Sequence, residues 1–124
     1  MEVSRVKKVL RSFKGADVAV VGDLILDGYV WGKVTRISPE APVPVVTVDR
    51  EDYTLGGAGN VVNNLASLGA NVSVGGVIGT FEDGDRMMDL FQKLGVDASG
   101  VIRDPHRPTT RKTRIVAAHQ HVLR

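Results

Sequence analysis

A cluster of glycines near the middle of the 124-residue chain has the composition of a ligand-binding turn. Residues 55–60 read Leu-Gly-Gly-Ala-Gly-Asn and lead into an apparent amphipathic helix. Glycine allows positive φ and close approach of a ligand to the main chain, and a helix start favours polar or anionic groups. Spacing alone fits a ligand-free strand-to-helix turn equally well. The segment matches neither a dinucleotide fingerprint, which needs a third glycine, nor a P-loop, which needs Gly-Lys-Ser/Thr.

Two carboxylates follow a predicted strand nearer the N-terminus. Residues 17–21 are apolar and rich in valine, a pattern that predicts a strand buried on both faces. Asp23 and Asp27 come at or just past its carboxyl end, which is the edge where open α/β sheets bind ligands. Turn formation or helix capping is the alternative interpretation, and it applies more to Asp23 than to Asp27.

The C-terminal part of the chain is basic. Residues 103–124 hold six Lys or Arg and one acid, a formal +5, which leaves −3 for residues 1–102 within the total of +2. Such a segment is typical of a phosphate-binding region, a nucleic-acid arm or a solvated end. Because its charges alternate with apolar residues, it favours folded strands over a loose arm. The small total charge argues against nucleic acid as a partner.

The segment between Asp27 and the glycine cluster differs in composition from the rest of the chain. Residues 29–54 begin with the amphipathic aromatics Tyr29 and Trp31, continue through a proline-punctuated run at 36–44 that excludes a helix, and end in a strand over 45–53. Prolines at one end of a strand and charges at the other suit an exposed or edge position. We therefore expect a small β excursion that serves as a flap or an oligomer contact.

The remaining elements predict an α/β fold. Strands separated by helices imply parallel βαβ units with right-handed crossovers. The expected helix after the glycines places Ala58, Val61, Leu65 and Leu68 on its inner face, before a stop at Gly69. The other expected elements are helices at 4–13 and 86–94, the second with a core side of Met87, Met88, Leu90, Phe91 and Leu94, and strands at 71–79, 96–102, 111–117 and 120–123.

Composition narrows the class of protein further. Hydrophobic residues make up 43% of the chain, which argues against disorder, and no apolar run is long enough to span a bilayer. The absence of cysteine excludes disulfides, thiolate metal sites and Cys nucleophiles, and a cytoplasmic protein is the simplest expectation. His119 and His121 lack a nearby third ligand, so we expect no metal site and interpret them as surface residues.

Motifs along the whole chain resemble the ribokinase (carbohydrate kinase) superfamily. Residues 20–29 read Val-Val-Gly-Asp-Leu-Ile-Leu-Asp-Gly-Tyr, and residues 56–60 carry the Gly-Gly-x-x-Asn motif that marks the superfamily. Residues 36–45, Arg-Ile-Ser-Pro-Glu-Ala-Pro-Val-Pro-Val, resemble the heptose 7-phosphate kinase branch more specifically. Segments 65–70 and 108–114, with Gln120 and Arg124, continue the resemblance in the family's order.

The resemblance implies roles for particular residues. The early aspartate of the superfamily holds sugar hydroxyls, which matches Asp27, and the glycine pair and asparagine line the same pocket, which matches Gly56, Gly57 and Asn60. The flap closes over the sugar and often builds a homodimer, which matches residues 29–54, with Tyr29, Trp31, Arg36 and Glu40 as lid residues. A sugar that already carries a phosphate needs cations, and the candidates are Lys112, Arg114 and Arg124.

The resemblance also implies missing machinery. The family fold is longer, and its ATP site and catalytic base lie in a Gly-Ala-Gly-Asp-type motif that does not occur after Gly100. Phosphoryl transfer needs an orienting base, an anion hole and Mg²⁺ near the phosphates. We therefore expect residues 1–124 to be the N-terminal, sugar-binding portion of a ribokinase-like domain, with no catalytic residue, weak binding of ATP and Mg²⁺, and no turnover alone.

The leading functional hypothesis is that the chain belongs to a sugar kinase. The reaction implied by the resemblance is ATP-dependent phosphorylation of heptose 7-phosphate at the anomeric hydroxyl, which feeds ADP-heptose and lipopolysaccharide core synthesis. Another ribokinase-family sugar kinase is the first alternative. A non-catalytic module for sugar-phosphate binding or dimerisation is the second.

Overall fold

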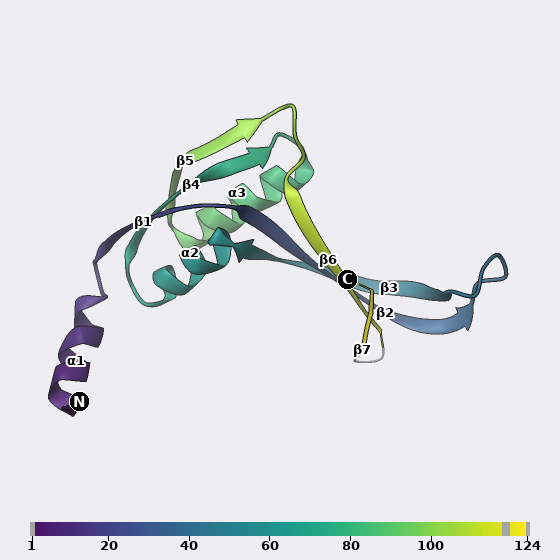
Figure 1. The fold of residues 1–124 in the computed structure, drawn as a ribbon, viewed down its shortest axis with the longest axis horizontal. Helices are drawn as coiled ribbons and strands as arrows, with labels where there is room; N and C mark the ends of the chain where they lie inside the picture. Colours follow the sequence, from purple (N-terminus) through teal and green to yellow (C-terminus); the bar gives the residue numbers. More distant parts are fainter. Residues whose placement is uncertain (1, 118–119, 124) are drawn as a thin grey trace.

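A three-stranded parallel sheet forms one part of the molecule. The computed structural model describes residues 2–117 and 120–123. In this sheet β4 lies between β1 and β5 and pairs in parallel with both (Figure 1). These pairings confirm the expected parallel βαβ arrangement, and the strand expected at 71–79 has the predicted bounds. The strands are β1 (Asp17–Val21), β4 (Asn71–Gly79) and β5 (Asp97–Asp104).

A second, mixed sheet extends away from the first as a long ribbon (Figure 1). Strands β2 and β3 are antiparallel, β6 pairs in parallel with β2, and β7 is antiparallel to β6. The ribbon extends beyond the flap expected at 29–54, because it begins at Leu24 and ends at Gly57. Asp27 therefore lies within a strand of the ribbon and not in a loop after β1. The strands are β2 (Leu24–Ile37), β3 (Pro44–Gly57), β6 (Thr110–Ala117) and β7 (Gln120–Leu123).

Three helices complete the fold: α1 (Val3–Ser12), α2 (Ala58–Ser67) and α3 (Glu82–Leu94). Helix α3 begins four residues before the predicted start at Arg86. Three acids, Glu82, Asp83 and Asp85, lie in its first turn, where negative charge complements the helix dipole. Gly95 ends the helix in the left-handed conformation, with φ of 69°, as a glycine stop predicts.

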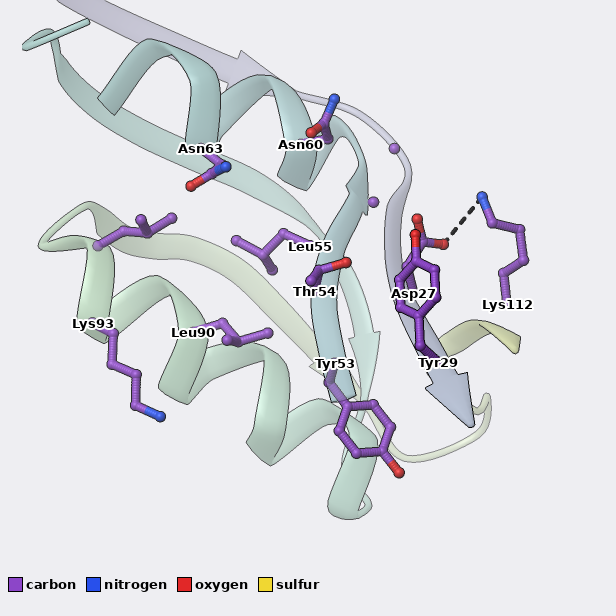
Figure 2. Close-up of a pocket in the computed structure, with 13 residues that line it drawn as sticks. Asp27, Tyr29, Tyr53, Thr54, Leu55, Asn60, Asn63, Leu90, Lys93 and Lys112 are labelled. Atoms are coloured by element: carbon purple, nitrogen blue, oxygen red, sulfur yellow. Dashed lines mark ion pairs between the residues drawn. The ribbon is translucent and has the colours of Figure 1, made fainter. Parts of the chain in front are cut away.

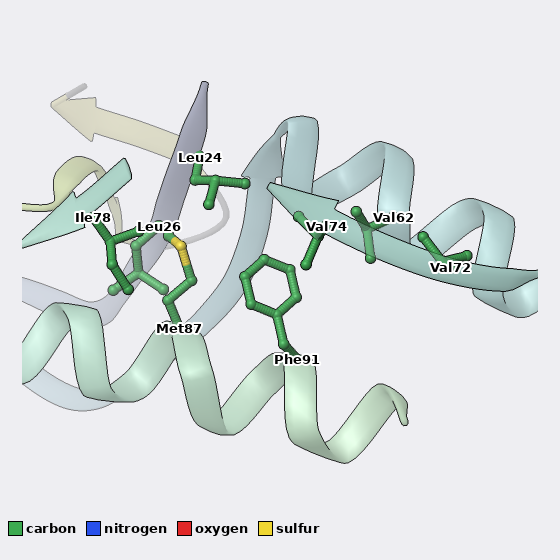
Figure 3. Packing of buried hydrophobic residues seen from close by; sticks show 8 residues of the cluster. All are labelled: Leu24, Leu26, Val62, Val72, Val74, Ile78, Met87 and Phe91. Atoms are coloured by element: carbon green, nitrogen blue, oxygen red, sulfur yellow. The ribbon is translucent and has the colours of Figure 1, made fainter. Parts of the chain in front are cut away.

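The hydrophobic core lies where α2 and α3 cover one face of the parallel sheet (Figure 3). Met87 and Phe91 of α3 are completely buried, which confirms the core side predicted for this helix, and Val62 of α2 is completely buried too. The cluster continues into the base of the ribbon and therefore joins the two sheets. Its buried members are Leu24, Leu26, Val62, Val72, Val74, Ile78, Met87 and Phe91.

The described residues leave the far face of the parallel sheet uncovered, so the prediction that β1 is buried on both faces was wrong. Val20 packs against the core, whereas the side chain of its neighbour Val21 is 83% exposed. Successive residues of a strand point to opposite faces, and the helices of the described chain that pack on this sheet contact the Val20 side. Apolar periodicity cannot tell a face that is covered from one that is not.

The inner face of α2 also differs from the prediction. Ala58 and Leu65 pack against the core, but Val61 and Leu68 are 47% and 53% exposed, and Val62 takes the central position. Gly59 and Val62 are the buried residues of the helix. Gly59 packs closely on Leu55, since a Cβ on Gly59 would lie 3.0 Å from Leu55 Cβ.

Helix α1 carries an apolar stripe that finds little cover in the described chain. Val9 and Leu10 are 49% and 55% exposed, and no residue of the helix is buried. Glu2 occupies the N-cap position of the helix and makes no side-chain hydrogen bond to the backbone there. Among residues 2–117 and 120–123, no helix has both the length and the apolarity needed to cross a bilayer.

Candidate functional site

A pocket of about 640 Å³ lies where the base of the ribbon meets α2 and α3 (Figure 2). It lies across the edge strand β3: Asn63, Leu90 and Lys93 are on one side of the strand, and Asp27, Tyr29 and Lys112 on the other. The remaining lining residues are Tyr53, Thr54, Leu55, Gly56, Gly57, Asn60 and Leu94. The structure therefore brings Asp27, both glycines, Asn60 and Lys112 together around one pocket.

Asp27 is the acid among the residues that line this pocket, and its side chain is largely enclosed. Its side chain is 14% exposed, and its two carboxylate oxygens lie 3.0 Å from Lys112 Nζ and 3.6 Å from Arg114 Nη1. The parallel pairing of β2 with β6 sets this arrangement, because it places Asp27 opposite Lys112. Although Oδ1 is close to the lysine, the contact does not have hydrogen-bond geometry, and Oδ1 is buried with no hydrogen-bond partner among the described residues. A hydroxyl donor entering the pocket would satisfy it.

The two glycines allow close packing that no other residue would permit. A Cβ on Gly56 would lie 2.9 Å from both Cγ and Oδ2 of Asp27, so the missing side chain makes room for the carboxylate. Gly57 has φ of 57°, and a Cβ there would overlap the main-chain oxygen of Asp23. That oxygen accepts a hydrogen bond of 2.8 Å from the N–H of Ala58, the first residue of α2. Asp23 therefore shapes the turn through its main chain.

Polar side chains on α2 extend the site. Asn60 and Asn63 both line the pocket and are three residues apart, so they lie on neighbouring turns of one helix face. Gly57 occupies the N-cap position, and no side chain caps the helix start. Amide groups donate and accept hydrogen bonds, which suits a ligand rich in hydroxyls.

The lid residues named from the sequence divide into two groups. Tyr29 lines the pocket and stacks on Trp31, with ring centroids 6.2 Å apart and planes 17° apart. Guanidinium groups lie over both rings, Arg114 over Tyr29 at 5.1 Å and Arg50 over Trp31 at 4.9 Å. The side chains of Trp31, Arg36 and Glu40 do not line the pocket; Arg36 lies on the exposed distal part of β2, and Glu40 in the loop joining β2 to β3.

Other lining residues were missed from the sequence. Tyr53, Thr54, Leu90, Lys93 and Leu94 belong to segments interpreted only as strand or as core helix. Asn63 carried a usable signal, since it repeats Asn60 one helical turn later. Lys93 lies in the last turn of α3, a position that cations favour for reasons unrelated to ligands, so its type gave no indication of a site.

Some named residues lie elsewhere. Arg114 contacts Asp27 and Tyr29 without lining the pocket, and Asp23 lines a separate cavity of about 430 Å³ beside β1 and β4. Arg124 and His119 are outside the described residues, so their predicted roles are not addressed by the structure. Among the described residues, no group of three or more His, Asp or Glu side chains could hold a metal ion.

The chain belongs to the pfkB family of carbohydrate kinases. The family model matches residues 16–123, nearly the whole chain. The matched residues include the α/β core, Asp27 and the glycine turn.

Comparisons with individual proteins agree with this assignment. The chain is 50% identical to the bifunctional protein HldE of Geobacter metallireducens over all 124 residues, and it spans about a quarter of that relative's length. It resembles a carbohydrate kinase of Agrobacterium tumefaciens with a TM-score of 0.70 and 22% identity, over 87% of this chain and 34% of that one. Arabidopsis thaliana ribokinase, solved with ribose and ATP, matches with a TM-score of 0.67 and 19% identity, over 87% and 34% of the two chains.

Proposed function

We propose that residues 1–124 form the sugar-binding portion of an ATP-dependent kinase that phosphorylates a heptose 7-phosphate at its anomeric hydroxyl. The observation that carries the proposal is the nearly buried carboxylate of Asp27, which lies beside two glycines and pairs with two cations, Lys112 at 3.0 Å and Arg114 at 3.6 Å. An acceptor of this kind suits the hydroxyl of a sugar. In this proposal the product enters ADP-heptose and lipopolysaccharide core synthesis.

Five residues of the pocket, together with Arg114 beside it, have specific tasks in this proposal. Asp27 accepts hydrogen bonds from sugar hydroxyls, and Gly56 and Gly57 let the sugar approach the main chain. Asn60 orients further hydroxyls. Lys112 supplies positive charge beside Asp27, and Arg114 adds a second cation, so the side of the pocket that holds Asp27 has a net positive charge suited to a phosphorylated sugar.

The heptose specificity rests on two observations of sequence. Residues 36–45 resemble the heptose kinase branch, and the chain shares 50% identity with a relative named HldE. The alternative substrates are those of other ribokinase-family sugar kinases. A non-catalytic sugar-phosphate-binding module is the second alternative, and it predicts binding without any contribution to turnover in a longer protein.

ATP and Mg²⁺ belong to the proposed reaction, but the described residues do not fit them. No cluster of three or more metal-ligating side chains occurs in this part of the chain, and the glycine turn packs against Asp27 and Asp23. We therefore assign no catalytic residue here and propose that other segments of a complete enzyme hold ATP. A reaction between ATP and a sugar phosphate would take place in the cytoplasm, where both metabolites are kept.

The proposed lid, which is also the proposed surface for homodimer formation, is the part of the ribbon formed by residues 29–54. Its distal part is two-stranded and exposes Val34, Ile37, Val43 and Val48, which are between 40% and 60% exposed. An isolated two-stranded ribbon is marginally stable in water, so pairing with a second copy would stabilise it. The expected observation is a dimer in analytical ultracentrifugation that Ile37→Asp converts to a monomer.

Binding measurements test the proposed substrate. Titration calorimetry should show that heptose 7-phosphate binds at least tenfold more tightly than ribose or fructose 6-phosphate, since the cations beside Asp27 favour a phosphate in one position. Asp27→Asn keeps the shape of the side chain and should weaken binding about tenfold or more. Asp49→Asn is the matched control, because Asp49 is an exposed acid of β3 that lies 4.0 Å from Lys33 and does not line the pocket. Equal affinities in the wild type and Asp27→Asn would refute the assignment.

A further inference from the structure

A cluster of charged side chains around Tyr53 lies on the core side of β3. It comprises Tyr53 and Glu51 of β3, Arg111 of β6, and Glu82, Asp83 and Arg86 of α3, and we call it the Tyr53 cluster. Two guanidinium groups lie over the tyrosine ring, Arg86 at 4.3 Å and Arg111 at 5.1 Å from its centroid. The cluster therefore joins one helix to two strands of the ribbon sheet.

The positions of both arginines are fixed by acids. Arg86 pairs with Glu82 at 2.6 Å, and Asp83 lies between the two arginines, 3.5 Å from Arg86 Nη1 and 3.4 Å from Arg111 Nη1. The hydroxyl of Tyr53 donates to Glu51, and Arg111 Nη2 donates to the tyrosine oxygen at 3.4 Å. The hydrogen bond to Glu51 raises the pKa of Tyr53, burial adds to the rise, and Arg111 and Arg86 oppose it.

Most of the cluster and the Asp27 carboxylate lie on opposite faces of the same strands, while Tyr53 itself also lines the pocket, which extends across β3. Tyr53 precedes Thr54, which is paired with Asp27 across β2 and β3. Arg111 precedes Lys112, which contacts Asp27. Since successive residues of a strand point to opposite faces, the cluster holds the two strands from behind while their next residues face the carboxylate.

We infer that Tyr53 is a positioning residue, which fixes edge strand β3 and Lys112 against α3 so that the Asp27 side of the pocket keeps its shape. Strand β3 is at the edge of its sheet and has a hydrogen-bonded neighbour, β2, on one side only in the described chain. The cluster connects the edge strand to α3, because Arg86 of α3 lies over the ring of Tyr53. The inference rests on the proposed function only for the identity of the ligand.

A ligand-free measurement tests the positioning directly. Hydrogen exchange of the backbone amides in residues 54–57 should become about tenfold faster in Tyr53→Ala and in Arg86→Ala, because each variant loses the cation–π contact between Arg86 and the Tyr53 ring. Tyr53→Phe keeps the ring and should remain within about threefold of the wild type. Arg103→Ala is the matched control, since Arg103 pairs with Asp85 of α3 outside the cluster and should leave residues 54–57 unchanged.

Ligand affinity provides the second measurement. Heptose 7-phosphate should bind about tenfold more weakly to Tyr53→Ala and to Arg86→Ala. The double variant should lose little further affinity, because each single change already removes the same contact between Arg86 and the Tyr53 ring. Unchanged exchange at residues 54–57 in Arg86→Ala, or an equal change in Arg103→Ala, would overturn the inference even if Tyr53→Ala fails to fold. If the wild type binds no sugar phosphate, the proposed function fails, while the exchange measurement still decides the role of Tyr53.

Discussion

The carboxylate of Asp27 occupies the space that a side chain at Gly56 would fill. A Cβ at position 56 would lie 2.9 Å from Oδ2 of Asp27, whereas the actual backbone leaves that volume to the carboxylate. The two residues are on adjacent strands, with Ile25 paired to Gly56 and Asp27 paired to Thr54. The pocket therefore depends on a small residue in β3 as much as on the acid in β2.

Gly56→Ala should weaken binding of a sugar phosphate by about tenfold or more, because the new methyl group pushes the carboxylate of Asp27 out of position. Titration calorimetry measures the change. Gly75→Ala is the control, since a Cβ at Gly75 would meet its neighbours at an ordinary 3.5 Å. Normal affinity in Gly56→Ala would show that the carboxylate does not need its present position.

Gly57→Ala should lower the free energy of unfolding by more than about 1 kcal/mol, because it places a side chain at positive φ and against the main-chain oxygen of Asp23. Urea denaturation measures the loss. Gly95→Ala separates the two causes, since Gly95 also has positive φ, 69°, but has open space where a Cβ would lie. We expect the loss at Gly57 to be the larger one, and equal losses would show that the contact with Asp23 is unimportant.

Phe91→Ala should cost about 3–5 kcal/mol of unfolding free energy, because a completely buried aromatic ring is replaced by a cavity in the cluster that joins the two sheets. Phe81→Ala changes the same residue type at a position that is 69% exposed and should be nearly neutral. Thermal or urea denaturation distinguishes them. A small effect at Phe91 would mean that the core is not packed as described.

Alkaline titration should show Tyr53 ionising above the ordinary tyrosine value of 10.0, because its hydroxyl donates to the Glu51 carboxylate. A raised pKa means that the folded state holds this proton more tightly, so the contribution to stability is complete below about pH 10 and is lost as the pH rises further. Absorbance at 295 nm measures the transition. Tyr53→Phe should remove the step above 10.0, and a wild-type titration in which no tyrosine ionises above 10.0 would contradict the contact.

Much of this protein could be predicted from its sequence. The strand at 71–79, the stop at Gly69 and the core side of α3 follow from local periodicity and from glycine's conformational freedom, both of which are properties of short segments. The motifs around Asp27 and Gly56 also predicted the family correctly. Local patterns sufficed because each of these features depends on residues close together in the chain.

Only the tertiary structure decided how these segments meet. The parallel pairing of β2 with β6 joins residues more than 80 positions apart, and a shift of one residue would turn Lys112 away from Asp27 and Arg111 away from Tyr53. Likewise, the exposure of Val21 and the burial of Gly59 and Val62 on α2 depend on which neighbouring element covers each face. The sequence by itself determined which residues carry the polar groups and the conformational freedom that a binding site needs, whereas strand register and packing decided which of them face one pocket.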